Sequence, residues 1–182
     1  MDDRAGIRAV VDHLLDLGHV HIAHVSGPDD FLHGNGRRRA FLDALAAAGL
    51  PPGRVETGDF TAAGGTAATR RLLADAKPPT AILYANDLMA IAGISEAQKA
   101  GLVVPDDLSV TGYDDTELSA HLHPSLTTVR TDAYGWGQVA AQTLLALVDG
   151  EPADDVALEP PRLIVRRSTA APHPRGINPT LS

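Results

Sequence analysis

The feature that most constrains this chain is a regular alternation of short apolar strands with amphipathic helices. Strand starts are expected near residues 21, 55, 81 and 109, which gives steps of 34, 26 and 28 residues. Crossovers of that length contain a helix and join parallel strands, so neighbouring strands run in the same direction with helices on both faces. The pattern therefore predicts an α/β fold built on a doubly wound parallel sheet.

Helix ends can be placed by their apolar stripes and by the glycines that follow them. Ile7, Val10, Val11, Leu14 and Leu15 share one helical face, and Gly18 is placed to end that helix in a left-handed cap. We expect further helices over 37–48, 62–76, 88–100 and from Asp132 to about 149, strands over 20–26, 81–84 and 108–113, an apolar step at 126–129, and extended pieces near 156 and 163–165.

Composition excludes several classes of protein. The 15 Lys and Arg residues against 23 Asp and Glu give a net charge of −8, which disfavours nucleic-acid binding by this chain's own electrostatics. With no cysteine there is no disulfide, thiol nucleophile or thiolate metal site. No apolar run approaches the about 18 residues of a membrane span, and Asp2 and Asp3 do not resemble a signal peptide, so we expect a cytoplasmic protein with no membrane partner.

Motifs for catalysis or cofactors are weak. His19, His21 and His24 could suggest a metal site, but no nearby carboxylate is placed in the sequence to complete one, so we expect no metal. The 34–36 stretch Gly-Asn-Gly lacks the features of a phosphate loop and is interpreted as a helix-entry loop. No Gly-x-Ser-x-Gly elbow is present. We therefore predict a binding module without a cofactor rather than an enzyme.

Polar and aromatic residues follow successive strands. Asp114 and Asp115 come after the 108–113 strand, Asn86 follows the 81–84 strand, and Phe60 follows the strand near 55. In open parallel sheets the carboxyl edge is where ligands bind. Asn86 or Asp87 could instead merely cap the next helix. Taken together with Arg37, which could bind hydroxyls or carboxylates, these groups favour a crevice for a sugar-like molecule.

The order of several short stretches resembles the effector-binding half of LacI/GalR-type transcription regulators. The matching stretches are LGH at 17–19, VSGP at 25–28, Arg37 with Phe41, PTAI at 79–82, ANDLMA at 85–90, GLVVPDDLSV at 101–110, GYDD at 112–115, PSLTTV at 124–129 and LIVRRST at 163–169. Regulators of this family carry a helix-turn-helix head and a two-lobed fold like that of periplasmic binding proteins.

The resemblance implies a division of the chain and a set of ligand contacts. Residues 1–131 would be the C-terminal lobe, 132–160 a segment of the N-terminal lobe, 161–169 a return strand, and 170–182 a disordered tail. Effector-contacting positions match Arg37, Asn86 and Asp114, a sugar-stacking aromatic matches Phe60, and positions that vary with effector match His33 and Thr131.

The implied function is sensing of a small sugar-like effector, which would control operator DNA through a head that these residues do not contain. The alternative is a periplasmic sugar-binding protein of an ABC-type transporter. A homodimer is implied, with Leu88, Ile91, Thr116 and Leu118 at the interface. The stripe that includes Trp136, Leu144 and Leu147 would pack on the N-terminal lobe, so without that lobe it should fray, associate or fold back.

Overall fold

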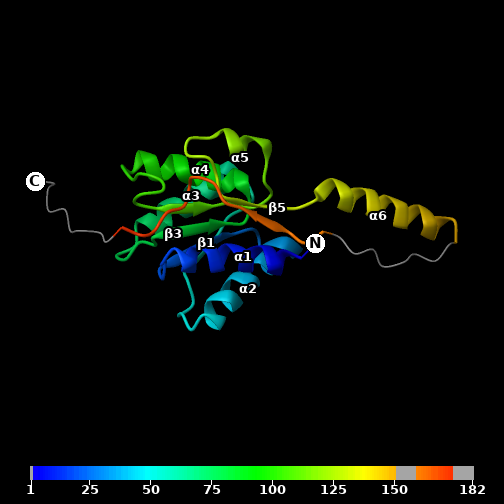
Figure 1. The fold of residues 1–182 in the computed structure, drawn as a ribbon, viewed down its shortest axis with the longest axis horizontal. Coiled ribbons are helices and arrows are strands. Elements are labelled where there is room, and N and C mark those ends of the chain that lie inside the picture. The colour runs from blue at the N-terminus through cyan, green and yellow to red at the C-terminus, as the bar shows by residue number, and fades with distance from the viewer. Residues whose placement is uncertain (1, 151–158, 174–182) are drawn as a thin grey trace, which may run out of the picture.

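The computed structural model describes residues 2–150 and 159–173 and shows the predicted alternation (Figure 1). The helices are α1 (Asp3–Asp16), α2 (Leu32–Ala47), α3 (Ala62–Leu73), α4 (Asp87–Lys99), α5 (Glu117–His121) and α6 (Ala133–Val148), and the strands are β1 (Ile22–Ser26), β2 (Val55–Thr57), β3 (Ala81–Tyr84), β4 (Ser109–Thr111), β5 (Thr128–Arg130) and β6 (Arg162–Ile164). The expected extended piece near residue 156 lies outside the described residues.

The central sheet is parallel, as predicted. Its strand order is β2-β1-β3-β4, with Ile22 opposite Ala81 and Ala81 opposite Ser109. β5 continues the same edge through a parallel bridge between Thr111 and Thr127, and it pairs with β6 in an antiparallel ribbon. The α/β class and the crossover topology are thus confirmed.

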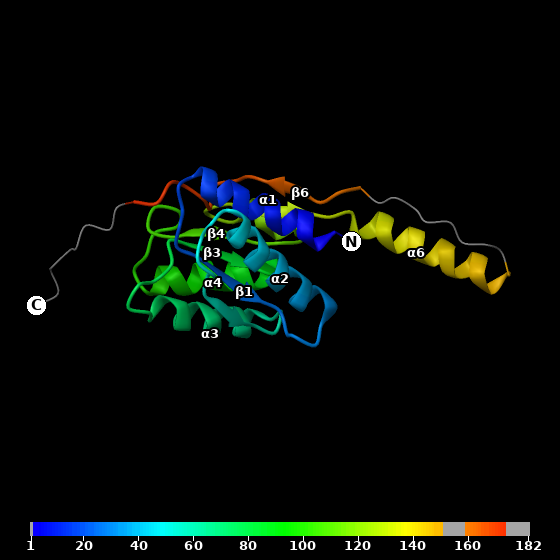
Figure 2. The same ribbon diagram turned by 90° about the horizontal axis from the view of Figure 1, so that it is seen from below.

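Both faces of this sheet are covered, because its strands alternate between two apolar clusters. Val25, Ile82 and Tyr84 face the cluster built with α3 and α4, whereas Ala81 and Leu83 face the cluster built with α1 and α2. Figure 2 shows α1 and α3 on opposite sides of the strands. Sheets buried on both faces present apolar side chains in both directions, which explains the continuous apolar runs of the sequence.

Several element ends differ from the sequence expectation, and the short helix α5 was not expected. α2 begins at Leu32 rather than at residue 37, so Gly34 lies inside the helix and not in an entry loop. A Cβ at Gly34 would lie 2.2 Å from the carbonyl oxygen of Pro28, so the glycine is needed for a close approach of the helix to that loop. β4 is also shorter than expected, ending at Thr111 instead of residue 113.

The last helix leaves the body of the molecule. α6 begins at the predicted cap, where Asp132 accepts a hydrogen bond of 2.8 Å from the amide of Gly135. It then projects away from the sheet (Figure 1), and none of its residues is buried against the described part of the chain. No helix in the described ranges has the length and apolar character needed to cross a bilayer.

The C-terminal strand returns to the body. Ser168 is buried, and its hydroxyl donates to the carbonyl of Val110 and accepts from the amide of Thr127. Ala170, which was placed in the expected tail, exchanges hydrogen bonds with the hydroxyl of Ser109. Residues 174–182 lie outside the described residues, and the assignment of the segments to two lobes stays a prediction.

Candidate functional site

The predicted ligand residues lie where the parallel strands end. Phe60 follows β2, Asn86 follows β3 and Asp114 follows β4, so all three are at the carboxyl edge of the sheet. Among the described residues, the non-glycine positions with positive φ are Phe60 at 64°, Asp114 at 118° and Asp115 at 53°. Strained backbone of this kind is concentrated at functional sites, which favours this edge as the binding region.

Arg37 is a buried cation at the centre of this edge. It lies in the second turn of α2 and is only 5% exposed. Its Nη1 lies 3.7 Å from Oδ1 of Asp114 and also donates to the carbonyl of Ala85. The guanidinium carbon lies 3.6 Å from the ring centroid of Tyr113, a cation–π contact. The guanidinium is therefore held in one orientation, as bidentate recognition requires.

Asp3 connects two predicted site residues and was not itself predicted. Its Oδ1 accepts from Nε of Arg37 at 3.1 Å, and its Oδ2 lies 2.6 Å from Nδ1 of His33. Asp3 starts α1, whereas its two partners lie in α2. Asp3 is separated from His33 by 30 residues and from Arg37 by 34 residues, so no local sequence pattern could show these contacts.

Asp114 is held in an environment that disfavours its charge. Burial raises the pKa of Asp114 to about 6, helped by repulsion from Asp87 and Asp3, while Arg37 and His33 act in the opposite direction. The side chain remains 43% exposed, so a ligand can still reach it. A carboxylate with an oxygen open to solvent can accept hydrogen bonds from two neighbouring hydroxyls.

Asn86 joins the cap of α4 to the loop that carries Phe60. Its Oδ1 accepts from the amide of Met89 at 2.9 Å, so it caps the helix, and its Nδ2 donates to the carbonyl of Phe60 at 3.0 Å. The ring of Phe60 meets Phe31 edge-on, with centroids 6.1 Å apart. Both the capping role and the site role considered for Asn86 are therefore compatible with its contacts.

A hollow of about 490 Å³ adjoins this cluster on the side facing α6. It is lined by Asp2, Asp3, Arg4, Leu32, His33, Gly36 and Trp136. Trp136 was predicted only as part of an apolar packing stripe. Its position in the lining makes it a further aromatic near His33, which the helical periodicity alone could not indicate.

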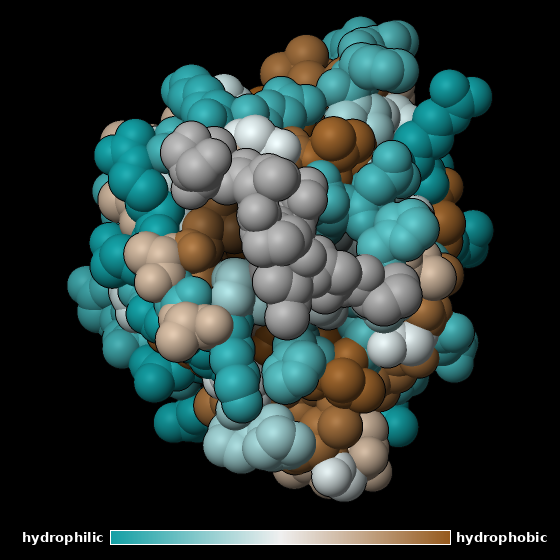
Figure 3. Space-filling model, turned by 90° about the vertical axis from the view of Figure 1, so that its left-hand side faces the viewer, coloured by the Kyte–Doolittle hydropathy of each residue, from teal (hydrophilic) through white to brown (hydrophobic). Residues whose placement is uncertain are grey.

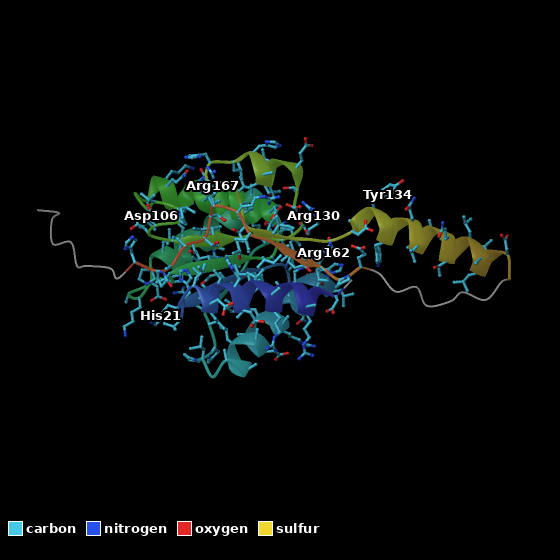
Figure 4. All side chains as sticks on the ribbon, in the orientation of Figure 1. His21, Asp106, Arg130, Tyr134, Arg162 and Arg167 are labelled. Carbon is cyan, nitrogen blue, oxygen red and sulfur yellow. The ribbon has the colours of Figure 1, made fainter. Side chains whose placement is uncertain are left out.

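Thr131 lines a different hollow from His33. That hollow, of about 440 Å³, is lined by Arg130, Thr131, Asp132, Glu159, Pro160 and Arg162. Figure 4 shows Arg130 and Arg162 on the side of the body from which α6 departs. The effector role of Thr131 stays a prediction.

The histidines of the first strand region have structural contacts. His19 is buried and its ring nitrogens lie 2.9 Å from Oγ1 of Thr80 and 3.0 Å from Oγ of Ser109. His24 is fully buried, and burial lowers its pKa to about 4. Within the described part of the chain, no three His, Cys, Asp or Glu side chains gather as a metal site would require.

Comparison with known proteins agrees with this architecture. Residues 11–169 match the family described as periplasmic binding protein-like domain. The chain is 38% identical over 183 residues to the HTH-type transcriptional regulator MalR of Streptomyces coelicolor, a match that covers 96% of this chain and 53% of MalR. The chain spans about half the length of the curated relatives it matches.

Solved structures of similar fold are also regulators. The transcriptional regulator CelR–cellobiose complex matches with a TM-score of 0.87 at 35% identity, over 92% of this chain and 52% of that chain. The Lac repressor dimer bound to operator and the anti-inducer ONPF matches with a TM-score of 0.88 at 35% identity, over 94% and 60%. The chain therefore belongs to the family of periplasmic binding protein-like domains, in the form found in LacI-family transcriptional regulators.

Proposed function

We propose that this chain is the ligand-sensing part of a LacI-family regulator and binds a small sugar-like effector. The observation that carries the proposal is the buried guanidinium of Arg37, fixed by Asp3 and Tyr113 at 3.7 Å from the partly open carboxylate of Asp114. A fixed cation beside a carboxylate offers donors and acceptors to the same pair of hydroxyls.

The chemical class of the effector follows from the groups around that pair. Phe60 offers a ring face for stacking, while His33 adds a further polar group beside Asp3. CelR, a relative of similar fold, was solved as a complex with cellobiose, which supports a carbohydrate as the class of ligand. We propose Arg37, Asn86 and Asp114 as hydroxyl contacts, Phe60 as the stacking ring, and His33 and Thr131 as residues that select among sugars.

Binding would act through linkage between two states of the protein. An effector that prefers one arrangement of the protein shifts the population toward it, and the affinity for DNA changes by the same free energy, commonly about 1–3 kcal/mol. The amide of Asn86 bonds to Phe60 and Met89 with one N–H and one oxygen lone pair, so a second N–H and a second lone pair remain for an effector. An effector bound there would contact the residue that caps α4.

DNA recognition would belong to a part of the regulator outside these residues. The net charge of −8 is opposite to that of a surface built for phosphates. The Lac repressor of similar fold was solved with operator bound, so we propose operator DNA as the partner of the intact protein and the cytoplasm as its location.

The alternative is a sugar-binding protein that serves an ABC-type transporter. The similar curated proteins are transcriptional regulators, which supports the regulator over the transporter component and is consistent with a protein that is not an enzyme. An upstream helix-turn-helix in the gene would support the regulator, whereas an upstream signal peptide would support the alternative.

We also propose that the intact protein is a homodimer through the start of α4 and the segment around α5. Leu88 and Leu118 are 50% and 55% exposed, while Ile91 is partly buried against the core and Thr116 lies at the start of α5. Exposed apolar side chains suit an isologous contact. Sedimentation of the intact protein as a monomer at micromolar concentration would contradict this proposal.

The experiment that tests the proposed site is calorimetry on the intact regulator with a panel of sugars. We expect Asp114→Asn to weaken binding of the preferred sugar by about 1.5–3 kcal/mol, the usual range for a hydrogen bond to a charged group. Asp106→Asn is the matched control, because Asp106 is exposed and lies at the opposite end of the sheet (Figure 4). Equal sugar affinity in wild type and Asp114→Asn would refute the assignment.

A further inference from the structure

Asp87 is a fully buried carboxylate next to the carboxyl edge of the sheet that carries Asn86 and Asp114, here called the effector edge. The proposed effector binding does not use Asp87. Its Oδ2 accepts from the amide of Thr116 at 2.8 Å, from the Thr116 hydroxyl at 3.1 Å and from the Ser119 hydroxyl at 2.6 Å. Its Oδ1 accepts from the Thr128 hydroxyl at 2.6 Å. The sequence offered Asn86 or Asp87 as the cap of the next helix, and the structure shows that the cap is Asn86.

The partners of Asp87 come from different parts of the fold. Thr116 immediately precedes α5, Ser119 lies in α5, and Thr128 lies in β5. In the described residues all of these partners are uncharged donors, so the buried charge depends on keeping them in place. Removing one donor from a buried charged group is costly, which makes such a network stiff.

The backbone of Asp87 is tied to the effector edge. Its amide donates to the carbonyl of Tyr113 at 2.8 Å, directly before Asp114. Gly112 makes this approach possible, because a Cβ there would lie 2.2 Å from Oδ1 of Asp87. The same residue therefore contacts the loop that carries Asp114 and adjoins Asn86.

The other end of the network reaches the proposed dimer segment. The hydroxyls of Thr116 and Ser119 lie 2.9 Å apart and both bond to Asp87, while Leu118 between them is 55% exposed. If effector binding moves Asp114 or Asn86, the hydrogen bonds of Asp87 would pass that movement to Thr116 and Ser119, which flank Leu118.

We propose that Asp87 is a positioning residue that transmits the state of the effector edge to the segment 116–121. The proposal rests on the proposed function for its ligand, but the connection itself is a property of this chain. Asp87 would not touch the effector; it would fix the relative position of the edge and of the segment that carries the dimer contact.

The first test is hydrogen exchange on the chain without any ligand. Ser119→Ala removes one hydroxyl from the network, and Asp87→Asn removes the charge at constant shape. We expect each variant to speed exchange about tenfold at the amides of both Thr116 and Asp114, because each opens a bond to a charged group. Faster exchange at Thr116 with Asp114 unchanged would overturn the proposal.

A matched control separates the network from general loss of a buried hydroxyl. Ser109→Ala is the same substitution at a buried serine whose hydroxyl bonds His19 and Ala170 at the other end of the strands. We expect Ser109→Ala to leave exchange at Thr116 and Asp114 unchanged. An equal increase in this control would show a global effect and would count against the proposal.

The second test measures coupling in the intact regulator. The ratio of sugar Kd with operator to sugar Kd without operator should move about fivefold toward 1 in Ser119→Ala and not in Ser109→Ala. A ratio equal to that of wild type would overturn the role of Asp87 in transmission. If wild type itself shows no response to any sugar, the proposed function fails, and the ligand-free exchange experiment still decides whether the connection exists.

Discussion

α2 and α6 are both 16 residues long, and their environments are the reverse of what their compositions suggest. α2 contains three consecutive arginines, yet it packs on α1 and buries Phe41, Leu45 and even the charged Arg37. α6 has no charged side chain from Ala133 to Val148, and none of its residues is buried against the described chain.

The difference shows that the position of a helix in the topology decides its burial, not its composition. α2 follows β1 and is returned to the sheet by the crossover, whereas α6 departs after Asp132 with Tyr134 pointing away from the body (Figure 4). At the opposite end of the molecule, hydrophobic patches are broken up by hydrophilic side chains (Figure 3). We therefore expect the apolar surface of α6 to be covered by another part of the intact protein or by a second chain.

The largest expected difference between the two helices is in hydrogen exchange of the isolated chain. Amides in the middle of α2 should be protected at close to the full stability of the fold, and those of α6 should exchange at least about 10³-fold faster, because an isolated helix of this length is marginal in water. Strong protection of α6 in a proven monomer would contradict the conclusion that α2 is packed on the fold and α6 is not.

A pair of identical substitutions tests the same contrast in free energy. Leu45 of α2 is 2% exposed and Leu145 of α6 is 64% exposed. Leu45→Ala should lower the free energy of unfolding by about 2–5 kcal/mol because it leaves a cavity. Leu145→Ala should change it by less than about 0.5 kcal/mol. Urea denaturation of the two variants measures both values, and similar losses would show that α6 is packed in solution.

The pH dependence of sugar binding probes Asp114, the carboxyl that lies 3.7 Å from the guanidinium that α2 supplies to the site. The pKa of Asp114 is raised to about 6 by burial, so this carboxyl is ionised at pH 7.5 and mostly protonated at pH 5. We expect sugar affinity in the intact protein to fall up to about tenfold between those values, because a protonated carboxyl loses acceptor strength.

Two controls keep that pH experiment specific. Asp114→Asn should flatten the profile of sugar affinity against pH, whereas His33→Gln, which removes the histidine beside Asp3, should leave the fall in affinity in place.

The contribution of Asp114 to folding stability changes with pH in the opposite direction to sugar affinity. The folded pKa lies above the ordinary value of 3.8, so the contribution of Asp114 favours folding at low pH and is lost as the pH rises through about 6. Asp114→Asn should therefore not reduce stability at pH 7.

Most of the fold could be predicted from local patterns. The helix ends at Gly18, Gly49, Gly101 and Gly150 all have positive φ, as left-handed caps require. The spacing of the strands predicted that neighbouring strands are parallel, because crossover length depends only on the chain between them. Each of these signals lies within a single strand–helix unit of the chain, so it can be found without knowing the tertiary structure.

The features that were not predicted depend on contacts between distant segments. Gly34 is the exception: it was interpreted as a loop residue, although its close approach is to Pro28 in the loop directly before α2. Asp3 bridges Arg37 and His33, and Asp87 gathers donors from α5 and β5, although neither has a local motif. Sequence position identified the edge at Asn86 and Asp114, while the structure was needed to find what holds that edge in place.

If this chain is the ligand-sensing part of a regulator, the DNA affinity of the intact protein must respond to a sugar. The most direct measurement is fluorescence anisotropy of operator DNA with the intact protein, titrated with a panel of sugars in wild type and in Arg37→Lys, which removes the planar fork beside Asp114. We expect one sugar to shift operator affinity about fivefold or more in wild type and to have little effect in Arg37→Lys. A wild-type affinity that no sugar changes, or an equal response in Arg37→Lys, would contradict it.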